Sequence, residues 1–333
     1  MRKQILFSTI ALFASAASLS AQSVMSVQVS ENADKTRVYA DIKMDSDGGI
    51  NTMNLDLKYP ASLTVNKSAF ATGGLCQEYD EDEGVYTPTW NLSSSNYAEY
   101  SFIRLVAYGQ TGKRIEAGQS GKLIRVTFDK TDPSAEYTAS DFLFNNVSGA
   151  LGGVIEEMKA PVCILGTNGY SSFSTSQDVI IEGATANYGT ISDNTLTLSP
   201  VAEGEPIFHG EGVILKGLEG TTVYATSVAT ATRPASNDVI ATGNGVEVAP
   251  NSVHVLSTEG GVTGFYLYTG TKIGAGKAYL TAPAGARIVI EEETGIDTLT
   301  EESAPAAIFN LQGQKMQEAK KGIQIVNGKK VMF

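Results

Sequence analysis

The alternation of apolar and polar residues with a period of two constrains this chain more than any other feature. In the stretch RVYADIKM, residues 37–44, every second side chain is apolar, and TMNLDLKY, residues 52–59, repeats the pattern. Successive side chains of a β-strand point to opposite faces, so this period predicts strands with one buried face. Similar runs, separated by Gly, Asn and Asp clusters, continue to residue 281. No stretch combines the 3.6-residue apolar period of a helix with helix-capping residues. The sequence therefore predicts an all-β protein built from sandwiches or barrels.

The first 21 residues have the organisation of an export signal. A basic start, Met1 to Lys3, precedes the short apolar run ILFSTIALFASAA and small residues up to Ala21. The apolar run is shorter than the roughly 20 residues that a membrane-spanning helix needs, and no later run approaches that length. We therefore predict a secreted or outer-surface protein without a transmembrane span.

Charge and cysteine content narrow the partners further. The formal net charge is −12, and the chain has no basic stripe. Binding to phosphate backbones needs clustered Lys and Arg, so a nucleic-acid partner is not expected. The two cysteines, Cys76 and Cys163, could form a disulfide in an oxidising compartment. Two buried, unpaired thiols are the alternative.

Shifts in composition divide the chain into segments. After the signal, residues 22–167 and 168–290 each read as a β-rich domain, with a seam in PVCILGTNGY. Residues 291–306 carry six acidic residues without apolar alternation, which predicts an exposed linker. Residues 307–333 contain Asn327-Gly328 between GIQIV and KKVMF, which predicts a terminal hairpin that pairs with the strand AAIFNL.

Signals of catalysis and metal binding are weak. His209 and His254 lie in strand-like sequence and outside any known catalytic or metal-binding spacing. GTKIGAGKA, residues 270–278, departs from the phosphate-loop pattern, and Lys43 occupies the first ligand position of the calcium-loop-like stretch 43–54. We expect neither catalysis nor a cofactor.

Aromatic residues around an acidic tetrapeptide are the candidate ligand site. The stretch QEYDEDEGVYTPTWNL has consecutive carboxylates at 80–83, which predicts a solvated loop tip or, alternatively, a weak surface calcium site. Exposed aromatic rings can stack on sugar rings, while nearby carboxylates bind hydroxyls. The candidate ligand-binding residues are Tyr79, Tyr86, Trp90 and Tyr97. The alternative is that these rings pack in the core and in cross-strand pairs.

The first domain resembles the cohesin-like modules of the carbohydrate-binding sandwich superfamily. The resemblance rests on GINTMNLDLKYPASLTV at 49–65, GGLCQ at 73–77, GKLIRVTFD at 121–129 and FLFNNVSG at 142–149. It implies a nine-stranded jelly-roll sandwich without catalysis. Such modules bind dockerin partners or polysaccharides, or serve as structural parts of surface proteins.

The remainder resembles the C-terminal half of secreted and surface proteins of Bacteroidetes. The motifs are GYSSFSTSQDVII, ATANYGTISDNTLTLSPV, GEGVILKGLEGT and TGIDTL, in that order. Asp297-Thr298-Leu299 matches a short O-glycosylation pattern of that phylum, which makes Thr298 a candidate modification site. The last 26 residues are similar to type IX secretion sorting signals.

These features together predict a non-catalytic exported or cell-surface binding protein. Its cohesin-like domain would recognise a glycan or a protein, with a polysaccharide or a cell-surface protein as partner. The alternatives are a structural, fimbria-like surface subunit and a glycan-active enzyme with an unrecognised carboxylate pair, which would need two carboxylates roughly 5 to 9 Å apart.

Overall fold

The structure is a computed structural model that describes residues 22–192, 195–281 and 288–291, together with four short strands between residues 308 and 332. The chain divides into two compact units, residues 1–291 and 292–333. In the described residues, no helix has the length and apolar character needed to cross a membrane.

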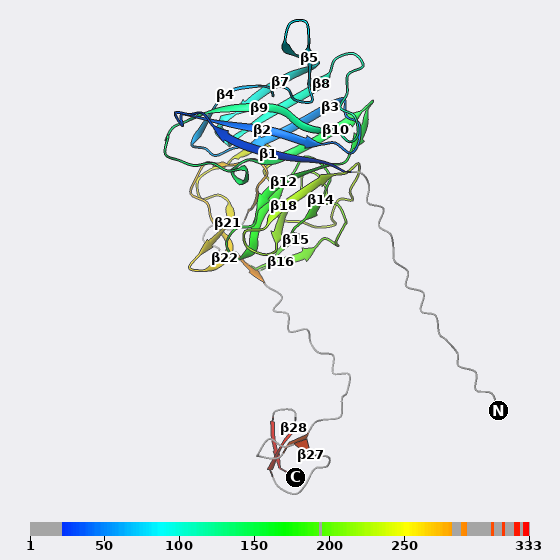
Figure 1. Ribbon diagram of the computed structural model, residues 1–333. Coiled ribbons are helices and arrows are strands. Elements are labelled where there is room, and N and C mark those ends of the chain that lie inside the picture. Colours follow the sequence, from blue (N-terminus) through cyan, green and yellow to red (C-terminus); the bar gives the residue numbers. More distant parts are fainter. Residues whose placement is uncertain are drawn as a thin grey trace, which may run out of the picture. The chain divides into compact units, whose positions relative to one another are not determined.

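The first part of the chain forms a sandwich of two β-sheets, as the period of two predicts (Figure 1). Within the described residues, the seven-stranded sheet has the order β14-β18-β12-β1-β2-β9-β4 and the five-stranded sheet has the order β11-β10-β3-β8-β7. The strands that precede residue 165 in these sheets are β1 (Ser23–Glu31), β2 (Arg37–Asp45), β3 (Thr52–Lys58), β4 (Leu63–Phe70), β7 (Trp90–Tyr97), β8 (Phe102–Gly109), β9 (Ser120–Lys130), β10 (Leu143–Leu151), β11 (Val154–Glu156) and β12 (Met158–Ile164). Three single 3₁₀ turns complete this part: η1 (Ala98–Tyr100), η2 (Ala139–Asp141) and η3 (Thr167–Gly169).

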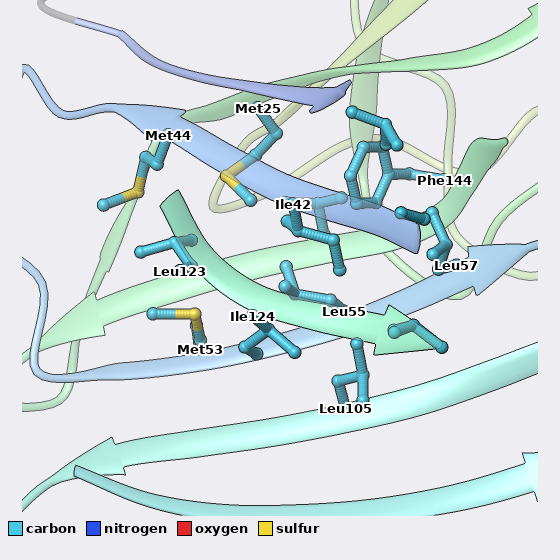
Figure 2. Packing of buried hydrophobic residues seen from close by; sticks show 14 of the residues in the cluster. Met25, Ile42, Met44, Met53, Leu55, Leu57, Leu105, Leu123, Ile124 and Phe144 are labelled. Carbon is cyan, nitrogen blue, oxygen red and sulfur yellow. The ribbon is translucent and has the colours of Figure 1, made fainter. Parts of the chain in front are cut away.

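The sandwich core lies between the inner faces of these two sheets. Ile42 and Met44 of β2 and Leu55 of β3 are fully buried, and Figure 2 shows them in one packed layer. Burial of each such side chain stabilises the fold by roughly 1.5–3 kcal/mol relative to exposure. The alternation in RVYADIKM and TMNLDLKY thus places the apolar face as predicted.

The second part is built around a sheet of nine strands among the described residues, in the order β13-β17-β15-β16-β25-β22-β21-β24-β19. Its strands are β13 (Tyr170–Ser174), β15 (Thr185–Ser192), β16 (Thr195–Pro200), β17 (Gly212–Lys216), β19 (Ile240–Ala241), β21 (His254–Glu259), β22 (Val262–Leu267), β24 (Ala278–Leu280) and β25 (Ile288–Glu291). β20 (Val246–Glu247) pairs with β23 (Lys272–Ile273).

Strand β12 joins the two parts into one sheet. It pairs with β1 in parallel on one side and with β18 (Thr222–Ser227) antiparallel on the other, and β14 (Val179–Glu182) continues beyond β18. Ala160 of β12 packs in the sandwich core, whereas Val162 packs in the core of the second part. The seam between 167 and 168 therefore falls beside a strand that serves both cores, and the limits 22–167 and 168–290 stay predictions.

The hairpin predicted for the end of the chain is confirmed. β28 (Ile323–Val326) pairs antiparallel with β29 (Lys329–Met332), with Val326 opposite Lys329, whereas Asn327-Gly328 lies outside the described residues. β26 (Ile308–Phe309), which lies in the stretch AAIFNL, pairs with β28 as expected, and β27 (Lys315–Met316) pairs with β26. The signal 1–21 and Thr298 lie outside the described residues, as does all of the predicted linker except Glu291, which ends β25.

Candidate functional site

The acidic tetrapeptide and two of the candidate tyrosines form a hairpin that projects from the sandwich (Figure 1). β5 (Gln77–Asp80) pairs with β6 (Val85–Pro88), and Tyr79 lies directly opposite Tyr86. Their ring centroids are 5.0 Å apart with the planes at 55°. Tyr79 is 53% exposed and Tyr86 is 45% exposed. The pair stabilises the hairpin across its strands, while much of both rings stays in contact with water.

The tip of this hairpin is a tight turn held by one of its own carboxylates. Asp80 Oδ1 accepts hydrogen bonds from the backbone N–H groups of Asp82 (3.0 Å) and Glu83 (3.1 Å). Gly84 closes the turn with a positive φ of 67°, a conformation that glycine adopts without strain. Among the residues with described side chains, no group of three His, Cys, Asp or Glu is placed to hold a metal ion. The tip thus matches the predicted solvated loop, with exposed carboxylates at 81–83.

The other two candidate rings are not part of this exposed surface. Trp90 is only 2% exposed and packs in the sandwich core. Tyr97 is partly buried and stacks on Phe102 with the centroids 4.5 Å apart and the planes at 6°. The Arg104 guanidinium covers the Tyr97 ring at 5.6 Å from its centroid. The structure therefore brings Tyr79 and Tyr86 together and places Trp90 and Tyr97 elsewhere, and a ligand-binding role for the four residues stays a prediction.

A second group of exposed apolar side chains lies on the outer face of the five-stranded sheet. In β8, Leu105 and Ala107 point into the core, so Val106 and Tyr108 point outward. Tyr108 is 49% exposed, and Ile155 of β11 is 54% exposed. The strand register places both residues in one row across the sheet, the row Asn91, Tyr108, Thr52, Ala150 and Ile155. We call this part of the outer face the open end, defined by Thr52, Asn91, Ser93, Val106, Tyr108 and Ile155.

The rest of that outer face is covered by the second part of the chain. Asp56 is fully buried and accepts two hydrogen bonds from Arg104, each 2.7 Å long, and one of 2.7 Å from Asn146. Arg104 also donates to Asn244 Oδ1 at 2.9 Å, which ties β8 to the second part. Lys58, two residues after Asp56 in β3, donates a hydrogen bond to the Val162 carbonyl at 3.1 Å. The exposed large apolar side chains of this face, Val106, Tyr108 and Ile155, therefore lie at the open end.

The projecting hairpin is anchored beside the open end. The N–H of Gln110, two residues after Tyr108, donates to the Thr89 carbonyl at 2.9 Å. Lys113 in the same loop forms an ion pair with Glu78 of β5. The exposed tyrosines of the hairpin and Tyr108 thus belong to the same end of the sandwich.

Sequence reasoning missed Val106, Tyr108 and Ile155. Their signal is present in FIRLVAYG, residues 102–109, where apolar residues occupy both alternating sets rather than one. A strand of this kind either is covered on both faces or exposes apolar residues on one face. β8 is covered on both faces near Arg104 and exposes Val106 and Tyr108 on its outer face further along.

The possible disulfide between Cys76 and Cys163 is not formed in the structure. Cys76 and Cys163 are both buried free thiols, and they belong to separate cores. Burial raises the pKa of the Cys76 thiol to about 12, and burial also raises that of Cys163. The alternative of two buried, unpaired thiols is the one that the structure contains.

The buried carboxylates of the described region, Asp41, Asp56 and Glu211, each form an ion pair with a basic side chain. Burial raises the pKa of Asp41, but hydrogen bonds from Arg125 and Lys122 outweigh it and lower the pKa overall. A glycosidase acid needs the opposite shift. His209 Nδ1 lies 2.7 Å from Asp178 Oδ1.

Comparisons with known proteins identify no family for this chain. No protein-family model matches it, and no curated protein matches it. Among solved structures it is similar to a non-cellulosomal cohesin from the hyperthermophilic archaeon Archaeoglobus fulgidus, with 14% sequence identity and a TM-score of 0.26, over 41% of this chain and 85% of that chain. The sheets define an all-β sandwich protein, and so distant a likeness carries no argument about its ligand, its compartment or its origin.

Proposed function

We propose that this chain is an exported, non-catalytic binding protein that holds a partner protein at the open end of its five-stranded sheet. The observation that carries the proposal is the gathering of exposed apolar side chains at this one end. Val106, Tyr108 and Ile155 lie on the sheet face, and Tyr79 and Tyr86 lie on the hairpin anchored beside it. Exposed apolar groups clustered within a polar surface are typical of protein interaction sites.

The composition of the open end favours a protein over a glycan. Tyrosine is enriched among the residues that dominate binding energy at protein interfaces. Val106 and Ile155 are aliphatic and lack the flat face that stacks on a pyranose, but they fill pockets in a protein partner. Asn91, Ser93 and Thr52 supply a polar rim around them. The export part of the proposal rests on the signal-like residues 1–21, and a display role for residues 307–333 rests on their similarity to sorting signals.

A second candidate, recognition of a polysaccharide, is favoured by one specific observation. Tyr79 and Tyr86 present half-exposed rings next to the carboxylates at 81–83, which is the combination that binds sugar faces and hydroxyls. This candidate uses the hairpin and not the sheet face. Variants at the two places therefore distinguish the candidates.

Site-specific photo-crosslinking tests the proposed function. A photoreactive phenylalanine analogue replaces Tyr108, and in a matched control it replaces Val262, an exposed residue of β22. The proteins are exposed to the cell-surface proteins of the source organism, and the crosslinked product is then purified and its affinity measured. We expect one discrete adduct from position 108, none from position 262, and at least about 30-fold weaker binding of the Tyr108→Ser variant.

Two outcomes would overturn this proposal. One is an adduct pattern that is the same from both positions. The other is binding to a polysaccharide panel that is lost in the double variant Tyr79→Ala and Tyr86→Ala but unchanged by Tyr108→Ser, which would establish the glycan candidate instead.

A further inference from the structure

A groove of about 920 Å³ lies in the second part of the chain, and nothing in the proposed function uses it. One wall is β14 with the turn after it, Ile180 to Ala186. The segment Val201–Glu205, which follows β16, forms another part of the lining. The end of β17 and the residues after it, Lys216 to Leu218, complete the lining.

The β14 wall is the edge of a sheet with an open backbone. β14 is the last strand of the seven-stranded sheet and pairs with β18 on one side. On its other side Val179 exchanges two backbone hydrogen bonds with Ile207, of 3.2 Å and 2.8 Å, in an isolated bridge. Backbone groups alternate along a strand, so the N–H and C=O of Ile181 point to the same side as those of Val179. Backbone pairing on this side of β14 thus ends at Val179, and the groove lies beside the residues that follow. An open sheet edge of this kind can pair with one more strand.

The charges of the lining are mainly negative. Glu182, Glu203 and Glu205 are exposed lining residues, and Lys216 is the one basic residue among the lining. Lys216 lies over the Tyr170 ring, 5.5 Å from its centroid, and Glu182 is paired with Lys159. Within the described part of the chain, Glu203 and Glu205 form no ion pair. The groove therefore offers two carboxylates to a cationic ligand.

The groove also has an apolar contact surface. Leu218 lines it and is 81% exposed, more than any other large apolar side chain in the described residues. Ile180 and Val201 line it as well and are partly buried. A ligand that matches this lining has a free backbone edge, apolar side chains and positive charge.

We infer that this groove binds an extended peptide segment of a partner protein, with Lys or Arg alternating with apolar residues. The segment adds to β14 as a strand, and its backbone bonds to the N–H and C=O of Ile181. Side chains of an extended strand alternate between two sides, so the basic residues reach Glu203 and Glu205 while the apolar ones meet Leu218. The class of ligand is thus defined by its positive charge, which complements Glu203 and Glu205.

The test uses the full mature chain and a hexapeptide of alternating lysine and valine with blocked ends. Calorimetry gives the affinity, and hydrogen exchange followed by NMR gives the protection of the Ile181 amide. We expect binding, protection of that amide, and no binding of a peptide of alternating glutamate and valine. A lysine-valine peptide with alternate N-methyl groups keeps its charge but lacks one bonding edge, so it should bind at least 10-fold more weakly.

A matched pair of variants locates the charges. Glu203→Gln with Glu205→Gln should weaken binding about 2- to 20-fold, in the range measured for two exposed ion pairs. Glu136→Gln with Glu259→Gln removes the same charge from exposed sites outside the groove and should leave the affinity unchanged. Equal affinity of the methylated peptide, an equal effect of the two double variants, or no binding at millimolar peptide would each overturn the inference.

Discussion

Replacement of Asp56 by Asn is the change whose effect the structure defines best. Three donors point at this buried carboxylate: Arg104 Nε, Arg104 Nη2 and Asn146 Nδ2, each at 2.7 Å. An amide of the same shape must turn its own NH₂ toward one of them and also leaves the Arg104 charge without a counter-ion. Loss of one partner of a buried ion pair costs about 3–5 kcal/mol. The Arg104 side chain is 27% exposed, so water offsets part of that cost, and we expect a loss of about 2–4 kcal/mol in the free energy of unfolding.

Calorimetric and urea unfolding of the mature chain measure this loss. For a unit of this size, about 2–4 °C of melting temperature is lost per kcal/mol, so the midpoint should fall by roughly 4–16 °C. Asp129→Asn is the matched control, because Asp129 pairs with Arg37 at 3.2 Å with about half of each side chain exposed. It should cost less than about 1 kcal/mol. An effect of Asp56→Asn no larger than that of Asp129→Asn would refute the reasoning.

Three further predictions follow from burial and from the division of the chain. Burial, with a smaller contribution from the nearby Lys277 charge, lowers the pKa of Lys58 to about 7. The unfolded chain then binds this proton more tightly than the folded chain, so the unfolding free energy should rise by about 3–4 kcal/mol from pH 7 to pH 10, and Lys58→Met should flatten that rise in urea titrations. Trp90→Ala should cost about 3–5 kcal/mol in the same assay, because Trp90 packs in the core. Deletion of residues 308–333, part of a separate compact unit, should leave the melting temperature of the remainder within about 1 °C in calorimetry.

The strands and the sandwich core could be predicted from the sequence because apolar residues at every second position form one buried face only in a β-strand. In RVYADIKM the alternate residues Val38, Ala40, Ile42 and Met44 are all fully buried. Asn327-Gly328 between two apolar runs likewise predicts a tight hairpin, since both positions favour positive φ. These features depend on neighbours in sequence alone.

The candidate site could be predicted only in part because exposure depends on contacts between distant segments. Tyr79 and Trp90 both lie in short, polar, strand-like sequence, yet the first is half exposed on a hairpin and the second lies in the core. Tyr108 alternates with core residues in a strand with two apolar faces, and only the position of the second part decides which of its residues are covered. The pairing of β12 with β18 joins residues more than 50 positions apart, and local pattern does not encode it.

The affinity of the partner captured at position 108 for variants of the open end tests the proposed function most directly. The double variant Tyr108→Ser and Ile155→Ser removes the two exposed large apolar side chains of the open-end row, and Val262→Ser is the control in the second part. We expect at least about 100-fold weaker binding by the double variant, since two residues that dominate an interface each contribute about 2 kcal/mol or more, and unchanged binding by the control. Equal affinity of the double variant and the wild-type chain would contradict a binding role for the open end.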